Sequence, residues 1–269
     1  MERAFLLLRR WVALSRAWHQ EDRSDGRKRP DRQEKRVMPE GNFFHYDQAA
    51  VEHLARKDKK LAAAMQAIGP VRREVMPDLF QALMHAITGQ QISMAAQRTV
   101  WGRLCALLGE VTPQALLAQP PAALQALGLS ARKVDYMRGI ARQVVDGELD
   151  LPGMAALDDA EVCRRLAALR GIGVWTAEML LLFSLQRPDI LSYDDLAIRR
   201  GLRMLYRHKE MPRERFERYR RRFSPYGSLA SLYLWAIAGG ALPELDDPAE
   251  GKKGSGRSSR RAREAAVKA

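Results

Sequence analysis

The segment Leu169–Leu196, LRGIGVWTAEMLLLFSLQRPDILSYDDL, restricts the fold of this 269-residue chain more than any other. Two glycines, Gly171 and Gly173, flank one apolar residue between two stretches that carry apolar side chains at helical spacing. Glycines this close permit a positive φ and leave backbone N–H groups open. The pattern predicts two helices joined by a tight turn, and the start of the second helix would favour an anion such as a phosphate. On the glycines alone, a packing corner without a ligand is the simpler explanation.

This hairpin resembles the helix–hairpin–helix of the DNA glycosylase superfamily, which includes endonuclease III, adenine glycosylase and the alkylpurine glycosylases. In that family an aspartate indispensable for base excision follows the hairpin, and here Asp195 lies twenty residues after Trp175. The stretch SYDDLAIRRG resembles the alkylpurine branch, in which the second aspartate of the pair is catalytic. The resemblance therefore implies that Asp195 is the catalytic residue and that Gly171, Gly173 and Thr176 contact the DNA.

A carboxylate at this position suits the chemistry of base excision. Breaking the bond between a purine and C1′ builds positive charge on the sugar, and a fixed anion nearby stabilises that charge. The carboxylate could also orient or deprotonate the attacking water. Alternatively, an aspartate here simply caps the next helix. We expect Asp194 or Ser192 to be that cap and Asp195 to point into a cleft.

Two tryptophans, Trp175 and Trp235, indicate which type of glycosylase this chain resembles. Trp175 stands where strand-cleaving branches carry a lysine, and Trp cannot form an imine, so the resemblance implies a monofunctional enzyme that leaves an abasic site. Trp in this position helps line the base pocket in the alkylpurine branch, and Met179 follows one turn later, where some relatives have an aromatic residue. The stretch 223–240, predicted as a helix opened by Pro225, resembles the family's C-terminal helix, whose Trp corresponds to Trp235. Its ring would attract an N-alkylated, cationic purine. A buried core Trp is the alternative for Trp175.

A second motif, GQQIS, lies between two helical patterns and predicts a helix break at Gly89 and a cap at Ser93. ITGQQIS resembles the loop that enters the DNA minor groove in small alkylpurine glycosylases. By position, Gln91 would fill the space left by a flipped base, and Gln90 would lie beside it. Without the first motif, two polar residues that solvate a helix junction would explain the pattern.

A third segment, LGLSARKVDY, predicts an N-cap at Ser130 and a helix that begins at Ala131. It resembles a segment that precedes the hairpin in the family. Lys133 is therefore a candidate DNA phosphate contact, and a solvated surface lysine is the alternative.

The net charge of +13 favours a nucleic-acid partner, but it is unevenly distributed. Residues 1–40 have a net charge of +4 and residues 251–269 one of +6, which leaves +3 for the middle. Within the middle, eleven Lys or Arg against three Glu gather between residues 199 and 222. We expect residues 1–40 to be disordered or to come from a start chosen too far upstream, and residues 249–269 to form a disordered basic tail that raises non-specific DNA affinity.

Helical periodicity and the near absence of β-branched alternation predict an all-α fold of about ten helices. The resemblance implies one glycosylase domain over residues 41–248. It would have a middle lobe over about 80–193, a second lobe from both flanks and Asp195 at the cleft between them. No run of eighteen apolar residues occurs, so we expect no membrane span. Two cysteines without a C-x-x-C pattern, and no clustered His, predict core thiols and no metal site.

The sequence therefore predicts a compact, monofunctional alkylpurine DNA glycosylase that lacks the N-terminal β domain of larger members. The implied substrate is double-stranded DNA containing alkylated bases such as 3-methyladenine or 7-methylguanine, and no cofactor is expected. We expect a monomer in the bacterial cytoplasm, at the nucleoid. Two alternatives remain open: a glycosylase for another damaged or mismatched base, and a non-catalytic DNA-binding module. The latter would not need Asp195 at this spacing or an aromatic pocket.

Overall fold

A computed structural model describes residues 42–250, which form twelve α-helices and one 3₁₀ helix. Within these residues, β structure is limited to one isolated bridge between Phe43 and Glu74. The predicted all-α fold is confirmed for this part of the chain. The predictions for residues 1–40 and for residues 251–269 of the tail lie outside it. Residues 249 and 250, predicted as the start of the disordered tail, form a turn in which both backbone N–H groups donate to Asp247.

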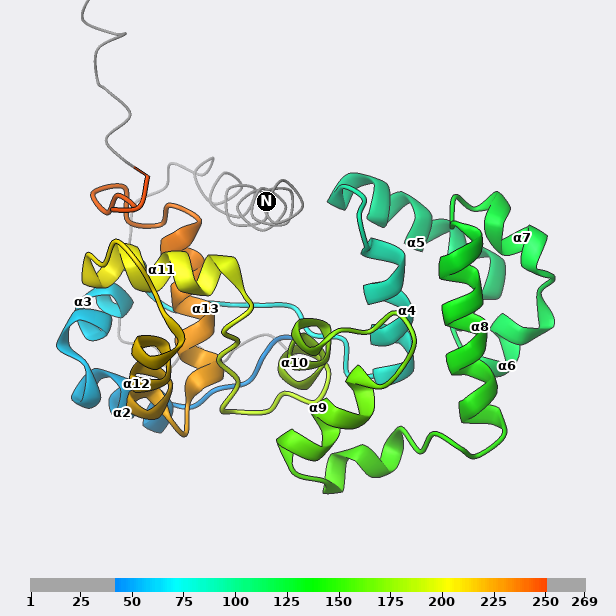
Figure 1. Ribbon diagram of the computed structural model, residues 1–269, viewed down its shortest axis with the longest axis horizontal. Coiled ribbons are helices and arrows are strands. Elements are labelled where there is room, and N and C mark those ends of the chain that lie inside the picture. Colours follow the sequence, from blue (N-terminus) through cyan, green and yellow to red (C-terminus); the bar gives the residue numbers. More distant parts are fainter. Residues whose placement is uncertain (1–41, 251–269) are drawn as a thin grey trace, which may run out of the picture.

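One group of helices combines both flanks of the described chain, on the left of Figure 1. It contains α2 (Gln48–Lys57), α3 (Lys59–Ile68), α11 (Leu196–Tyr206), α12 (Arg213–Phe223) and α13 (Gly227–Ala238). α13 is buried along nearly its whole length and packs against the other four helices. Gly201 of α11 faces the backbone of α13, where an added Cβ would lie 2.3 Å from the Leu234 carbonyl oxygen. These two helices can approach so closely only because Gly201 has no side chain.

The second group comes from the middle of the chain. It contains α4 (Leu79–Gly89), α5 (Met94–Leu108), α6 (Pro113–Ala118), α7 (Pro121–Ala126), α8 (Ala131–Val145), the 3₁₀ helix η1 (Pro152–Ala156), α9 (Asp159–Ala167) and α10 (Val174–Phe183). α8 packs against α4, α6 and α7, whereas α10 packs against α9 and α4. Figure 1 shows α10 between the two groups, and the chain returns from it to the first group through residues 184–195. α10 therefore lies at the junction where a shared site can form.

Two predicted helix starts are confirmed. Ser93 accepts a hydrogen bond from Ala96 N at the start of α5, and Ser130 accepts one from Lys133 N at the start of α8. Both follow from the preference of a serine hydroxyl for the free N–H groups of a first turn.

The start predicted for the helix over 223–240 was wrong. α13 begins at Gly227, after Pro225. Gly227 N donates to Asp189 Oδ1, and Ser228 N donates to the Pro188 carbonyl. The helix therefore starts where a distant loop satisfies its first N–H groups, and no local signal for that exists in the sequence.

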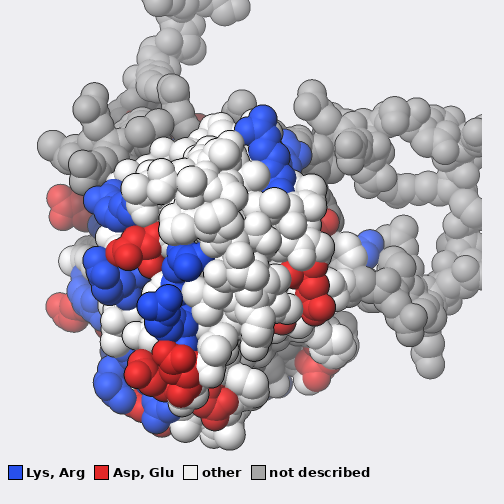
Figure 2. Space-filling view, turned by 90° about the vertical axis from the view of Figure 1, so that its right-hand side faces the viewer, with Lys and Arg blue, Asp and Glu red and all other residues white. Residues whose placement is uncertain are grey.

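Figure 2 looks onto the end of the second group. The centre of this face carries no charge. Lys and Arg lie mainly along its left side and at the top, and Asp and Glu lie on the left side and at the right edge. Among residues 42–250, no helix is both long and apolar enough to cross a membrane.

Candidate active site

Asp195 is the point where three helices meet. It is 5% exposed and lies at the N-terminus of α11. Its Oδ1 accepts hydrogen bonds from Ile198 N at 2.8 Å and from Trp235 Nε1 of α13 at 3.1 Å. Its Oδ2 accepts from Trp175 Nε1 of α10 at 2.9 Å. These three N–H donors, one from each helix, fix the orientation of the carboxylate.

The expected capping arrangement was wrong. Asp195 itself is the N-cap of α11, whereas Asp194 is exposed and the buried Ser192 donates its hydroxyl hydrogen to Glu178 Oε2. Helix capping and catalysis, which the sequence analysis treated as alternatives for this aspartate, are compatible because a carboxylate has two oxygens. One caps the helix and accepts from Trp235, and the other faces the indole of Trp175.

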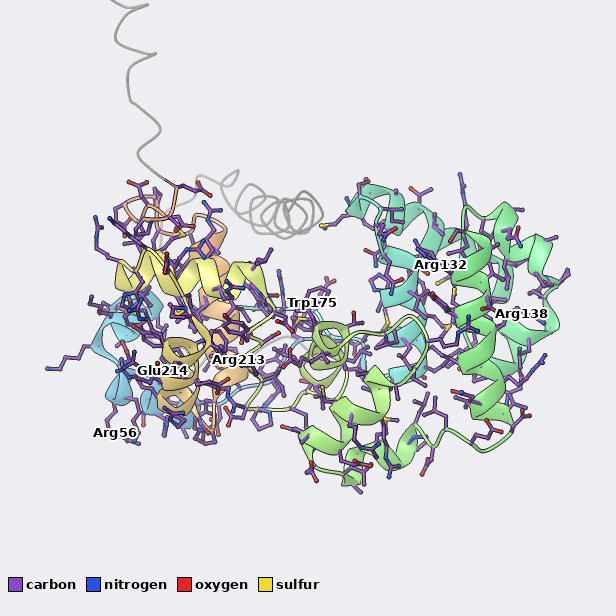
Figure 3. The ribbon with its side chains drawn as sticks, in the orientation of Figure 1. Arg56, Arg132, Arg138, Trp175, Arg213 and Glu214 are labelled. Atoms are coloured by element: carbon purple, nitrogen blue, oxygen red, sulfur yellow. The ribbon has the colours of Figure 1, made fainter. Side chains whose placement is uncertain are left out.

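Both predicted pocket tryptophans therefore bind the same carboxylate. Trp175 is half-buried, and Figure 3 shows it between the two groups of helices. Trp235 is 5% exposed and its ring stacks on Phe183, with centroids 5.5 Å apart and an interplanar angle of 23°. Met179 follows Trp175 by one turn on α10 and is buried. The three predicted base-pocket residues therefore come from the two helices that contact Asp195: Trp175 and Met179 from α10, and Trp235 from α13.

Glu178 is a second carboxylate at the site, and the sequence analysis did not single it out. It lies one turn after Trp175 on α10 and accepts the hydroxyl hydrogen of Ser192. Burial raises the pKa of its carboxyl, and the negative charges of Asp194 and Asp195 act in the same direction, while the Ser192 hydroxyl and Arg213 oppose them. The three-residue spacing from Trp175 was the available signal, but a glutamate inside a helix more often faces solvent.

The hairpin between α9 and α10 has the backbone that its glycines predicted. Gly171 has φ +89°, and an added Cβ would lie 2.3 Å from Cδ2 of Tyr136 on α8. α10 begins at Val174 with Gly173 as its N-cap residue, so no side chain caps it. Thr176, in the first turn, is half-buried. Uncapped first-turn N–H groups are the arrangement expected where an anion accepts from them.

The α4–α5 corner lies directly against this hairpin. Gln90 Nε2 donates to the Gly171 carbonyl oxygen at 2.7 Å. Lys133 Nζ, from α8, donates to the Thr88 carbonyl oxygen at 2.9 Å. Gln91 is exposed, with a left-handed backbone at φ 58°. Of the three polar residues predicted here to contact DNA, Gln91 has its side chain at the exposed tip, and the other two donate to backbone carbonyls.

Positive charge gathers beside the carboxylates. The guanidinium carbons of Arg199 and Arg213 lie 4.8 Å and 5.0 Å from the centroid of the Tyr193 ring. Figure 3 shows Arg213 in the first group of helices, near the junction. Both arginines belong to the basic stretch between residues 199 and 222, so part of that stretch reaches the site.

Within residues 42–250, no group of three or more His, Cys, Asp or Glu is placed to hold a metal ion. Cys105 and Cys163 are free thiols that are partly buried and pack against the hydrophobic core, at the edge of the core position predicted for them.

Comparison with known proteins gives one consistent result. A family model described as HhH-GPD superfamily base excision DNA repair protein matches residues 84–225. The chain is 30% identical over 209 residues to DNA-3-methyladenine glycosylase 1 of Schizosaccharomyces pombe, covering 75% of this chain and 91% of that protein.

Two of the solved structures that resemble this one are 3-methyladenine glycosylases. The first is a DNA-3-methyladenine glycosidase from Bacillus halodurans, with a TM-score of 0.68 and 34% identity, covering 75% of this chain and 94% of that one. The second is the S. pombe 3-methyladenine DNA glycosylase Mag1 in complex with abasic DNA. It has a TM-score of 0.62 and 30% identity, covering 70% of this chain and 95% of that one.

Proposed function

Because this chain belongs to the HhH-GPD superfamily of base excision DNA repair proteins, we propose that it is a monofunctional DNA glycosylase for N-alkylated purines. It flips the damaged base out of double-stranded DNA and hydrolyses the N-glycosidic bond, which leaves an abasic site. Its substrates are purines such as 3-methyladenine and 7-methylguanine. The observation that carries the proposal is the Asp195 carboxylate held between the indole N–H groups of Trp175 and Trp235.

Asp195 supplies the chemistry. Cleavage of the bond to C1′ leaves positive charge on the sugar, and a preoriented carboxylate stabilises the transition state more than the ground state. It needs no reorganisation because three N–H donors already hold it. The same carboxylate orients the attacking water. An N-alkylated purine is a cationic leaving group, so departure of the base needs little help from an acid.

The tryptophans select the base. Their N–H groups face Asp195, and a cationic purine would be attracted by the π faces of their rings. One face of Trp235 already stacks on Phe183, so the base would use its other face. Met179 adds an apolar, polarisable contact beside Trp175. Since Trp175 has no amine, the enzyme forms no Schiff base and leaves the strand uncut.

The hairpin and the α4–α5 corner bind the DNA. Gly171, Gly173 and Thr176 present the N-terminus of α10 to a backbone phosphate. Gln91 enters the space that the flipped base vacates, which offsets part of the cost of unstacking. Such an enzyme works as a monomer on chromosomal DNA, in the cytoplasm at the bacterial nucleoid.

Base release from methylated duplex DNA, followed by chromatography, tests the proposal. We expect the wild type to release 3-methyladenine and 7-methylguanine. Asp195→Asn should lower the single-turnover rate by at least about 100-fold, the scale found when one preorganised electrostatic contact is removed. Asp194→Asn is the matched control because Asp194 is adjacent but exposed, and its rate should stay within about twofold of the wild type.

Three results would count against the proposal. Release of no base by the wild type would reject the enzyme, and release of 8-oxoguanine in place of alkylpurines would reject the substrate class. An Asp195→Asn variant with the wild-type rate would reject Asp195 as the catalytic residue.

A further inference from the structure

We propose that Gln90 is a positioning residue that joins the α4–α5 corner, residues 88–93, to the hairpin, residues 169–174, and thereby sets the position of Gln91. The inference rests on the proposed function, because it takes Gln91 as the side chain that fills the vacated space. It assigns Gln90 a role inside the protein in place of a contact with DNA.

The first support is the direction of the Gln90 side chain. Its Nε2 donates to the Gly171 carbonyl oxygen at 2.7 Å, although the two residues are 81 positions apart in the sequence. A carbonyl oxygen only accepts, so the amide nitrogen must face the hairpin. To use this N–H group on a base, Gln90 would have to give up its bond to the hairpin.

A second contact holds the same corner from another helix. Lys133 Nζ of α8 donates to the Thr88 carbonyl oxygen at 2.9 Å. Thr88 is fully buried at the last turn of α4, and its hydroxyl donates to the Met84 carbonyl oxygen at 2.8 Å. A lysine at a helix C-terminus also interacts favourably with the helix dipole. The end of α4 is therefore fixed immediately before Gln90.

A third contact closes the arrangement between α8 and the hairpin. The Tyr136 ring occupies the space where Gly171 would carry a Cβ. Arg170 lies over the Tyr136 ring, with its guanidinium carbon 5.6 Å from the ring centroid, and forms an ion pair with Asp135 at 3.1 Å. The corner, α8 and the hairpin thus contact one another pairwise, and Gln90 provides the hydrogen bond on the corner–hairpin side.

The position of Gln91 follows from these contacts. Gln91 adopts a left-handed backbone, uncommon for a residue with a side chain, and it is exposed at the tip of the corner. A side chain that must enter the base stack works best when its backbone is already placed, because less ordering is then needed on binding. Since Gln90 precedes Gln91 directly, its bond to Gly171 places the inserting residue relative to the hairpin that grips the phosphate.

Hydrogen exchange in the full-length protein without DNA tests the coupling. Removal of one hydrogen bond costs about 1 kcal/mol, which corresponds to a change of about fivefold. Gln90→Ala should therefore speed amide exchange in peptides that span residues 88–93 by about fivefold. Gln66→Ala is the matched control because Gln66 is an exposed glutamine on α3, in the other group of helices. It should leave exchange at the corner unchanged, and unchanged exchange in Gln90→Ala would overturn the inference.

Excision kinetics separate positioning from direct contact. Gln90→Ala should slow single-turnover excision of a paired alkylpurine by about fivefold, and should slow excision of the same base in a bulge, where it has no partner, by less than about twofold. In a Gln91→Ala background, Gln90→Ala should add no further loss, because its effect passes through Gln91. Additive losses would show that Gln90 acts on DNA directly and would overturn the proposal.

Equal losses on the paired and bulged substrates would also overturn it, since they would indicate general damage to the fold. A wild-type protein that excises nothing would reject the proposed function, and the exchange comparison would still decide whether Gln90 positions the corner.

Discussion

The indole N–H of Trp175 donates to Oδ2 of Asp195 across 2.9 Å, joining two residues twenty positions apart. Where the strand-cleaving branches have a nucleophilic amine, this chain has a hydrogen-bond donor to the proposed catalytic carboxylate. Trp235 donates to the other oxygen from α13. The carboxylate is thus held from both groups of helices, and its orientation depends on how the two groups are joined.

The first prediction removes these donors while keeping an aromatic ring. A hydrogen bond to a charged group contributes about 1.5–3 kcal/mol, so Trp175→Phe should lower the single-turnover excision rate by about tenfold to about a hundredfold. Trp235→Phe should have an effect of the same size. DNA affinity, measured by gel shift, should change by less than about twofold in both variants, because the lost contact is internal.

Trp101→Phe is the matched control, because Trp101 lies on α5 and packs edge-on against His85 with centroids 5.0 Å apart. We expect its rate to stay within about threefold of the wild type. A Trp175→Phe enzyme as fast as this control would mean that the indole N–H does not orient Asp195.

Local sequence signals predicted those features that local chemistry decides. The caps at Ser93 and Ser130 follow from the next three residues, and the turn at Gly171 follows from the lack of a side chain. The start of α13 was mispredicted because Asp189, 38 positions earlier, binds Gly227 N. Contacts between distant segments set that boundary.

The candidate site divides in the same way. The resemblance to the glycosylase family implied that Trp175 and Asp195 share one site. It could not show that their polar atoms are bonded, nor that Trp235 binds the same carboxylate from forty positions away. Gln90 and Lys133 were predicted as DNA contacts because their segments resemble family motifs. Their bonds to the carbonyls of Gly171 and Thr88 depend on how three helices pack.

The second prediction concerns Glu178 and pH. Because burial raises the pKa of its carboxyl above the usual 4.5, the folded state holds this proton more tightly than the unfolded state. Ionisation of Glu178 therefore destabilises the folded state. This loss of folding stability is absent below pH 4.5 and grows as pH rises through the folded-state pKa. The free energy of unfolding of Glu178→Gln, measured with urea, should therefore equal that of the wild type at pH 4 and exceed it at pH 7. Glu148→Gln, at an exposed position, is the control and should change the free energy of unfolding by less than about 0.5 kcal/mol at pH 7.

The third prediction concerns a buried ion pair outside the site. The Asp247 side chain is 0% exposed and accepts from Arg203 Nε at 3.0 Å and from Arg203 Nη2 at 2.5 Å. Burial opposes ionisation of this carboxyl, but the bonds from Arg203 and the Ala249 N–H lower its pKa below the usual 3.8. Asp247→Asn should lower the free energy of unfolding by about 3 kcal/mol at pH 7, because the Arg203 guanidinium, only 19% exposed, loses the negative charge that balances it.

The pH dependence of this effect has the opposite sign to that of Glu178. The stability that Asp247 contributes is present above pH 3.8 and is lost as pH falls through its lower folded-state pKa. Urea unfolding from pH 7 down to pH 2 should therefore show the wild type approaching the variant. Asp246→Asn, at the exposed neighbour, is the control and should change stability by less than about 0.5 kcal/mol. If Asp247→Asn changed the free energy of unfolding as little as Asp246→Asn does, the ion pair would add no net stability.

The last prediction tests the junction between α11 and α13 through Gly201. A Cβ at this position would lie 2.3 Å from the Leu234 carbonyl oxygen, and a backbone atom cannot move aside as a side chain can. Gly201→Ala should lower the free energy of unfolding by about 1–3 kcal/mol, even though alanine favours helix formation more than glycine does. Excision should slow as well. Asp195 caps α11 and Trp235 directly follows Leu234 on α13, so separating these helices lengthens the hydrogen bond from Trp235 to Asp195. Gly139→Ala is the matched control, since Gly139 is helical with open space around it. It should raise stability by about 0.5–1 kcal/mol and leave the excision rate unchanged. A Gly201→Ala protein that gains stability as the control does would show that the helix contact tolerates a side chain, and the proposed link between this contact and Asp195 would fail with it.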